Sequence, residues 1–154
     1  MADLVSTLTE TLTLNGSTIS SSNAKTIAVT EAFKRVIKVP ANNDTTILKF
    51  NSSVHFNDGA LDIENVKYIR ITNTDGSNGV TLQLQIDTGA DDSASDQSCS
   101  IRLEAGRHFI LGTPKSSLIV DDDSPAYDAA LRDLESIMVD SSTNEVILEI
   151  FVAG

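Results

Sequence analysis

Two stretches near the middle of the chain alternate between side chains of two kinds. In the first, Val66, Tyr68, Arg70 and Thr72 alternate with Lys67, Ile69 and Ile71, and the Asn/Asp/Gly-rich run 73–79 follows. In the second, the apolar positions are Val80, Leu82, Leu84 and Ile86, and the polar positions are Thr81, Gln83, Gln85 and Asp87. A period of two is typical of half-buried strands, and such a run is typical of a turn. The pattern predicts an antiparallel hairpin.

Composition extends this prediction to the whole chain. The 154 residues are 40% hydrophobic with no Trp, so the core must be built mainly from Val, Ile and Leu, which suit packed sheets. We expect one all-β domain, an antiparallel β-sandwich or jelly-roll-like barrel with one short helix. Further strands are expected at 33–39, 45–50, 54–56, 99–103, 107–111 and 117–120, and a final hairpin is expected around Ile137, Val139 and the alternating positions 146–152.

The one helix signal lies before that final hairpin. Ser124 can cap a helix and Pro125 suits its first position. Tyr127, Leu131 and Leu134 then recur at a spacing of four and three. These features predict a short helix that ends near Leu134.

The first 23 residues differ from the rest in being rich in Ser and Thr. Leu8, Leu12 and Leu14 alternate with Thr before Asn15-Gly16, which predicts a strand and a tight turn, and the run 20–23 (Ser-Ser-Ser-Asn) is interpreted as a linker. Residues 1–23 are therefore either an arm that becomes ordered against a neighbour or an ordinary edge hairpin. Residues 24–154 form the single β-sandwich domain.

Charge and cysteine content limit the partners. The net charge of -11, from 22 acidic and 11 basic residues, repels nucleic acid and anionic lipid, so we expect no nucleic-acid or membrane partner. Basic residues gather mildly at Lys34, Arg35 and Lys38, which is either a partner surface or a solvated strand face. Cys99 is the only cysteine, so no intrachain disulfide forms, and its spacing with Ile101 and Leu103 predicts that it points inward. With no signal-peptide pattern and no long apolar run, we expect a protein that is soluble in a cytoplasm.

One local motif points to an enzyme. The segment 86–93, containing Asp87-Thr88-Gly89, resembles the active-site loop of retroviral-type aspartic proteases, and the resemblance would make Asp87 catalytic in a shared-proton pair. The rest of that family's pattern is missing, because Ala105-Gly106-Arg107-His108 follows too soon to leave room for a flap. A turn after a strand has the same composition, and we favour that interpretation.

The remaining candidates for chemistry have weaker patterns. Clustered carboxylate oxygens that could bind calcium occur at Asp121-Asp122-Asp123 and at Asp91-Asp92 with Asp96. Neither cluster has the alternating acidic positions, the central Gly and the terminal Glu of a calcium-binding loop, so we favour solvated loops. His55 and His108 have no metal spacing, and neither a nucleophile elbow nor a phosphate loop is present. We therefore expect no catalytic, cofactor-binding or metal-binding residue and no enzyme activity.

Several segments together resemble small virion structural proteins of tailed bacteriophages, particularly marine and cyanobacterial phages. They are the opening 8–16, the central segments 66–73 and 80–85, the segment 103–112 and the closing 149–153. The resemblance covers most of the chain in composition and pattern, without a diagnostic motif, so it assigns no role to any residue.

The resemblance implies a protein that assembles onto a particle. It implies a non-enzymatic capsid decoration (cement) protein of the virion, which binds and stabilises the major capsid protein lattice. The lattice favours a homo-oligomer, with a trimer preferred because closed symmetric oligomers are common. A tail or head-tail connector component and a receptor-binding fibre module stay open, although a glycan-binding module is expected to offer aromatic platforms and the chain has only Tyr68 and Tyr127 besides its Phe residues. The aspartic protease is the minor alternative.

Overall fold

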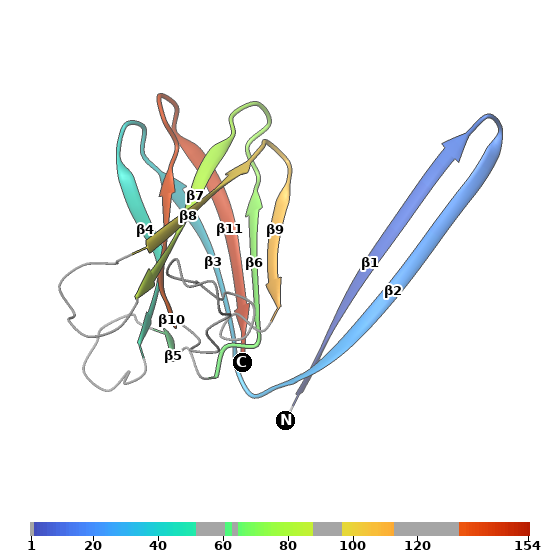
Figure 1. Ribbon diagram of the computed structural model, residues 1–154, viewed down its shortest axis with the longest axis horizontal. Helices are drawn as coiled ribbons and strands as arrows, with labels where there is room; N and C mark the ends of the chain where they lie inside the picture. Colours follow the sequence, from blue (N-terminus) through green and yellow to red (C-terminus); the bar gives the residue numbers. More distant parts are fainter. Residues whose placement is uncertain (1, 52–60, 63–64, 88–96, 113–132) are drawn as a thin grey trace, which may run out of the picture.

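The chain is all-β, as the alternation predicts. The computed structural model describes residues 2–51, 61–62, 65–87, 97–112 and 133–154, and every regular element in these ranges is a strand (Figure 1). The strands are β1 (Ala2–Leu14), β2 (Ser17–Val29), β3 (Ala32–Val39), β4 (Asp44–Asn51), β5 (Leu61–Asp62), β6 (Tyr68–Asn73), β7 (Val80–Asp87), β8 (Gln97–Leu103), β9 (His108–Gly112), β10 (Asp133–Asp140) and β11 (Val146–Ala153).

The strands form three sheets. A four-stranded sheet has the order β3-β11-β6-β9, and a five-stranded sheet has the order β5-β4-β10-β7-β8. All neighbours in them pair antiparallel except β4 and the two-residue β5. The third sheet is the β1–β2 hairpin, which stands away from the other two (Figure 1). We call the four- and five-stranded sheets together the body.

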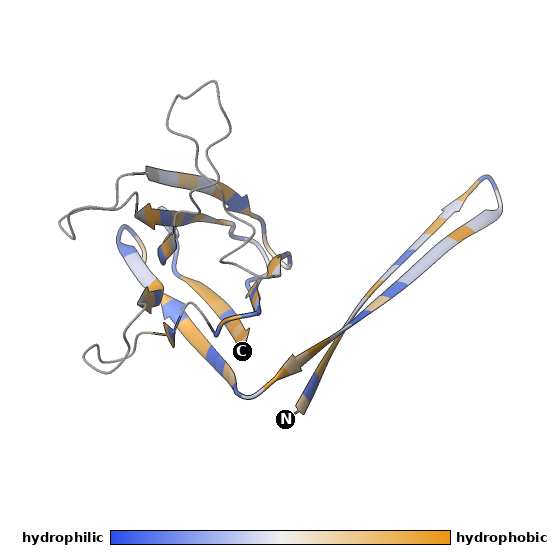
Figure 2. Ribbon diagram, turned by 60° about the horizontal axis from the view of Figure 1, so that its bottom comes forward, coloured by the Kyte–Doolittle hydropathy of each residue, from blue (hydrophilic) through white to orange (hydrophobic). Residues whose placement is uncertain are grey.

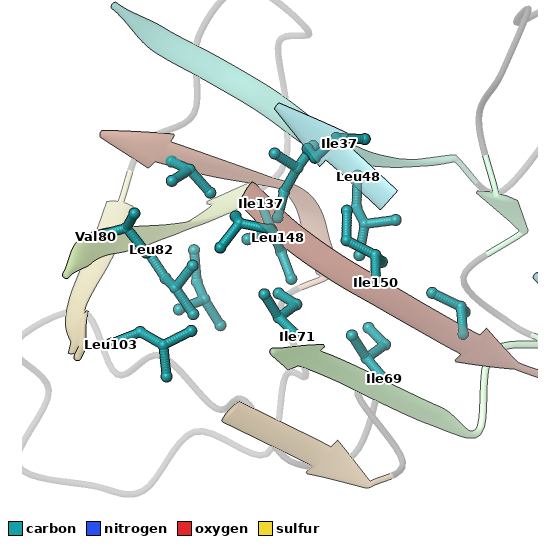
Figure 3. Packing of buried hydrophobic residues seen from close by; sticks show 14 of the residues in the cluster. Ile37, Leu48, Ile69, Ile71, Val80, Leu82, Leu103, Ile137, Leu148 and Ile150 are labelled. Atoms are coloured by element: carbon teal, nitrogen blue, oxygen red, sulfur yellow. The ribbon is translucent and has the colours of Figure 1, made fainter. Parts of the chain in front are cut away.

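The core of the body draws on both of its sheets. One cluster of buried side chains joins the two sheets (Figure 3). It includes Ile69, Ile71, Leu148 and Ile150 from the four-stranded sheet and Leu82, Leu84 and Ile137 from the five-stranded sheet. The predicted inward face of β7 is confirmed, since Val80, Leu82, Leu84 and Ile86 are at most 3% exposed. Branched aliphatic side chains at alternate positions thus build the core, as the composition predicts.

Both predicted hairpins in the body are wrong in their pairing. β6 pairs with β11 and β9, whereas β7 pairs with β10 and β8, so the turn between them crosses from one sheet to the other. The final strands behave in the same way, because β10 pairs with β4 and β7 while β11 pairs with β3 and β6. The alternation of apolar and polar residues shows which face of a strand is buried. The same alternation arises whether the next strand in the chain pairs within the same sheet or lies in the opposite sheet.

A buried asparagine fixes the crossing between β6 and β7. The fully buried Asn73 side chain donates from Nδ2 to the carbonyl oxygens of Asn78 (2.8 Å) and Leu103 (3.3 Å), and its Oδ1 accepts from the N–H of Asp75 (3.0 Å). Asp75 Oδ1 in turn accepts from the N–H groups of Ser77 and Asn78 at 2.8 and 2.7 Å. Side-chain oxygens thus accept hydrogen bonds from backbone N–H groups of the turn. A connection between two sheets needs such partners, because its backbone cannot pair with a neighbouring strand.

Two further predictions are met at most in part by the described residues. No helix is present in them, and Leu134, expected at the end of a helix, is a buried residue of β10; the other residues of that signal, together with the strands expected at 54–56 and 117–120, lie outside the described ranges. Cys99 lies on the core-facing side of β8, in register with Leu84, as its spacing predicts, but its side chain is exposed. Leu103 is buried and Ile101 partly buried on the same edge strand, so burial fades along β8 toward Cys99.

The N-terminal hairpin is longer than the sequence indicated. β1 and β2 pair in unbroken register from Ala2 with Val29 to Leu14 with Ser17, and Asn15 and Gly16 both have positive φ, 51° and 77°, as a two-residue type I′ turn requires. The run 20–23 is therefore not a linker but part of β2, and the hairpin continues past the expected boundary at residue 23 to Val29.

Candidate functional site

Most of the residues that sequence analysis singled out for chemistry lie outside the described ranges, and those within them are not brought together. Asp87 ends β7 in register with Asp133 of β10, and Thr88 and Gly89 lie outside the described residues. The same holds for His55, for Asp91, Asp92 and Asp96, and for Asp121–Asp123. Among the described residues, no group of three or more His, Cys, Asp or Glu side chains is placed to hold a metal ion. None of them forms a helix with the length and apolar character needed to cross a membrane.

The best-defined surface feature is the side of the four-stranded sheet that faces away from the core, which we call the outer face. Antiparallel register places Lys34, Phe151, Arg70 and Ile110 in one row across β3, β11, β6 and β9, and Val36, Glu149, Thr72 and His108 in the next row. Val36 is 61% exposed, Ile110 50% and Ile147 45%. The outer face therefore offers apolar side chains to a contact, together with charged ones.

Glu149 organises the charges at the centre of the outer face. Its two carboxylate oxygens accept from Lys34 Nζ at 2.9 Å and from Arg70 Nη2 at 2.6 Å. The hydrogen bond from Lys34 is the main reason that the pKa of Glu149 is lowered, the charges of Lys34 and Arg70 act in the same direction, and desolvation opposes them. Arg70 also lies over the Phe151 ring, 5.9 Å from its centroid. Lys34, Glu149, Arg70 and Phe151 thus form a preorganised set of side chains that spans the two rows.

Some polar groups on this face have no partner. Arg70 Nε and Thr72 Oγ1 are buried and make no hydrogen bond within the described structure. Both side chains project to the outer face, where Arg70 lines a cleft of about 660 Å³ between β1 and the sheet. Buried polar groups are nearly always paired in native proteins, so Arg70 Nε and Thr72 Oγ1 are two groups that a water molecule or a further contact would satisfy.

The cleft shows how the hairpin meets the body. It is lined by Leu4, Val5, Ser6, Thr7, Leu8 and Thr9 of β1 and by Tyr68, Arg70, His108, Ile110 and Phe151 of the sheet. At its closed end, Leu4 and Ile27 of the hairpin pack with Val29 against Tyr68, Phe151 and Ala153. The rings of Tyr68 and Phe151 meet edge to face at 6.2 Å, and Lys67 Nζ donates to the carbonyl oxygen of Ala28 at 2.8 Å. The base of the hairpin is therefore attached through the outer face.

The hairpin itself has two different sides. Register places Leu4, Leu8, Leu12 and Leu14 of β1 on the same side as Ile19 and Ile27 of β2, and we call this side the apolar side. The opposite side carries mainly Thr, Ser and Ala, together with Asp3 and the 59%-exposed Val5. Hydroxyl pairs on this side join Thr9 with Ser22 and Thr13 with Thr18, both at 3.2 Å. Beyond the base, the apolar side is open: Leu8, Leu12, Leu14 and Ile19 are 62%, 55%, 58% and 63% exposed.

Sequence reasoning anticipated only part of this surface. It found the alternating leucines of β1 but missed the exposed apolar residues of the outer face. The available signal was the mixed pattern of residues 33–39, in which Val36 stands among basic residues at the polar positions of the strand. The pairing of Arg70 with Glu149 had no local signal, because the two residues are brought together by non-local strand pairing.

Comparison with protein-family models, with curated proteins and with solved structures finds no match to this chain.

Proposed function

We propose that this chain is a non-enzymatic structural protein of a bacteriophage virion, a capsid decoration protein that binds the major capsid lattice as a homo-oligomer, with a trimer preferred. The observation that carries the proposal is the hairpin, in which a row of exposed aliphatic side chains extends away from the body. A two-stranded hairpin is only marginally stable alone in water, and exposed apolar rows on soluble proteins mark interaction surfaces. Such an element suits a protein that acts by assembling with others.

We further infer that the body is a jelly-roll sandwich. If β3, β4 and β6 to β11 are numbered one to eight along the chain, the two sheets have the orders 1-8-3-6 and 2-7-4-5. This nested order, in which the first strand pairs with the last and the fourth with the fifth, is that of the jelly roll, an architecture of viral capsid and lectin domains. It supports a virion role as a fold-level analogy only.

Binding to capsids tests the proposal directly. The probe is a capsid shell stripped of its decoration protein, and the variant replaces residues 7–24 by Asn-Gly, so that Ser6 and Lys25, which face each other in register, flank a new two-residue turn. This shortened-hairpin variant keeps the base contacts of Leu4, Ile27 and Val29. The full chain is expected to bind shells at fixed stoichiometry, and the variant is expected to bind poorly.

Electron microscopy of the native particle separates the structural alternatives. Density for this chain on the capsid surface supports decoration, whereas density at the tail or connector replaces it with the alternative role. A receptor-binding fibre module needs aromatic platforms for glycans, and Tyr68 does not provide one, because it is 7% exposed beneath the base of the hairpin.

The protease alternative is tested at Asp87. Its chemistry depends on a carboxylate pair at that position, so Asp87→Asn would abolish any peptide cleavage that pepstatin-type inhibitors block. The structural role predicts no such cleavage, unchanged assembly and a change in unfolding free energy of no more than about 1 kcal/mol.

A further inference from the structure

The hairpin and the outer face are two unpartnered surfaces on one chain. The apolar side of the hairpin contacts the body only at its base, through Leu4 and Ile27. Strands of 13 residues span about 43 Å at about 3.3 Å per residue, so the distal part extends far beyond that contact (Figure 2). On the outer face, Val36 and Ile147 lie on β3 and β11 with large exposed fractions.

We propose that the outer face of the β3-β11-β6-β9 sheet is the docking site for the distal hairpin of a second copy of this chain. The proposal rests on the homo-oligomer part of the proposed function and names the surfaces through which the copies associate. In this arrangement the distal hairpin of one copy packs on the outer face of the next copy. Each copy therefore contributes one hairpin and one outer face.

The intramolecular contact provides the strongest argument. Leu4 and Ile27 already pack against Tyr68 and Phe151, which belong to the outer face. Leu8, Leu12, Leu14 and Ile19 continue the same side of the same hairpin, and Val36 and Ile147 continue the same face of the same sheet. The two open surfaces are therefore extensions of the two sides of one apolar contact that the chain already makes.

Charge is consistent with the same pairing. Within a chain of net charge -11, β3 has no acidic residue and places Lys34 and Lys38 on the outer face, whereas Arg35, in register with Ile150, lies on the opposite face. The apolar side of the hairpin carries Glu10 between Leu8 and Leu12, and Lys25, in register with Ser6, nearer the base. The distal part of the hairpin therefore carries an acidic residue that can approach Lys34 and Lys38, which on the outer face already pair with Glu149 and Glu145.

Geometry also decides the kind of assembly. A hairpin-to-sheet contact is heterologous, because the two patches differ, and such contacts close into rings when the rotation allows it. In a cyclic trimer every hairpin contacts an outer face, and no copy of either surface is left without a partner. The contact does not need the capsid, so it is measurable on the isolated full chain.

Sedimentation velocity across a concentration series, with two substitutions and two matched controls, tests the proposal. Leu12→Lys disrupts the apolar side, and Thr11→Lys places the same charge at the adjacent position on the opposite side. Val36→Glu disrupts the outer face, and Ser100→Glu places the same charge on the exposed β8 of the other sheet. We expect the wild type and both controls to associate alike, and Leu12→Lys and Val36→Glu each to weaken association by about ten- to a hundredfold.

Mixing the two disrupted variants identifies the partner surfaces. The Val36→Glu chain keeps an intact hairpin and the Leu12→Lys chain keeps an intact outer face, so the mixture is expected to form one-to-one dimers at concentrations where neither variant associates alone. Association of Val36→Glu at the wild-type level, with Leu12→Lys monomeric, would indicate hairpin-to-hairpin contact and overturn the proposal. A monomeric wild type, or no dimer in the mixture, also overturns it. Binding to stripped capsid shells is scored separately, so a monomer that still decorates shells leaves the proposed function standing.

Discussion

The body and the hairpin are built from the same kind of alternating strands, yet they use their aliphatic residues in opposite ways. Leu82 and Leu84 in β7 are fully buried between neighbours of both sheets, whereas Leu12 and Leu14 in β1 are more than half exposed. The difference lies in the number of layers, because a strand in the body packs one face against the other sheet, while each hairpin strand has one neighbour and, beyond the base of the hairpin, no second layer. The body supplies stability, and the hairpin supplies surface.

The largest expected effect is in the core of the body. Leu84→Ala removes a fully buried side chain from β7 and is expected to lower the unfolding free energy by about 2–5 kcal/mol, through lost burial and a residual cavity. Urea denaturation of the dissociated chain measures it. Gln83→Ala, at the neighbouring position facing the other way, is the control and is expected to cost under about 0.5 kcal/mol. Equal losses at the two positions would contradict the assignment of the buried face.

A smaller effect is expected at the sheet-to-sheet connection. Asn73→Ala leaves the carbonyl oxygen of Leu103 and the N–H of Asp75 without their side-chain partner, which is expected to cost about 1–3 kcal/mol. Asn43→Ala serves as the control, because that asparagine makes only an exposed hydrogen bond to Ala41. Thermal or urea unfolding that ranks the two substitutions equally would show that Asn73 does not hold the crossing.

The same substitution in the hairpin is expected to behave differently from Leu84→Ala. Leu12→Ala removes the same atoms from a 55%-exposed side chain, so the unfolding free energy of the dissociated chain should change by less than about 0.5 kcal/mol. Its effect should appear instead in the concentration dependence of sedimentation. A loss close to that of Leu84→Ala would mean that the hairpin belongs to the cooperative unit of the body.

The smallest effect concerns pH and the outer face. Because the folded chain lowers the pKa of Glu149, this carboxylate stabilises the fold above its usual pKa of about 4.3, and the contribution is lost as pH falls through the lowered value. Glu149→Gln and Lys34→Met should therefore both flatten the acid side of the stability profile. An acid side that is steeper in either variant would contradict the role assigned to the Lys34–Glu149 pair.

Strand faces were predictable from the sequence and strand partners were not. The alternation at 80–87 identified the buried side of β7, because burial follows the side-chain period whatever lies beyond. The partner of β7 depends on whether residues 74–79 return the chain to the same sheet or carry it across, and that choice rests on hydrogen bonds from Asn73 to residues distant in the sequence. A two-residue turn such as Asn15-Gly16 leaves no such choice, and that hairpin was found.

The exposed surfaces had a weaker signal for a related reason. An aliphatic residue at every second position predicts a buried face, and in the hairpin the same pattern meets no second layer within the chain. The leucines of β1 beyond the base of the hairpin and Val36 in β3 are alike in being exposed apolar residues, although only the leucines recur with a period of two. An apolar strand face that the chain itself does not bury marks a candidate interface.

The shortened-hairpin variant tests most directly whether the body determines folding stability and the hairpin determines association. Urea unfolding and sedimentation velocity are measured on the same sample, with residues 7–24 replaced by Asn-Gly and the base contacts of Leu4 and Ile27 retained. The account predicts a monomer that unfolds cooperatively at the midpoint of the dissociated full chain. An oligomer of unchanged size, or loss of cooperative unfolding, would contradict it.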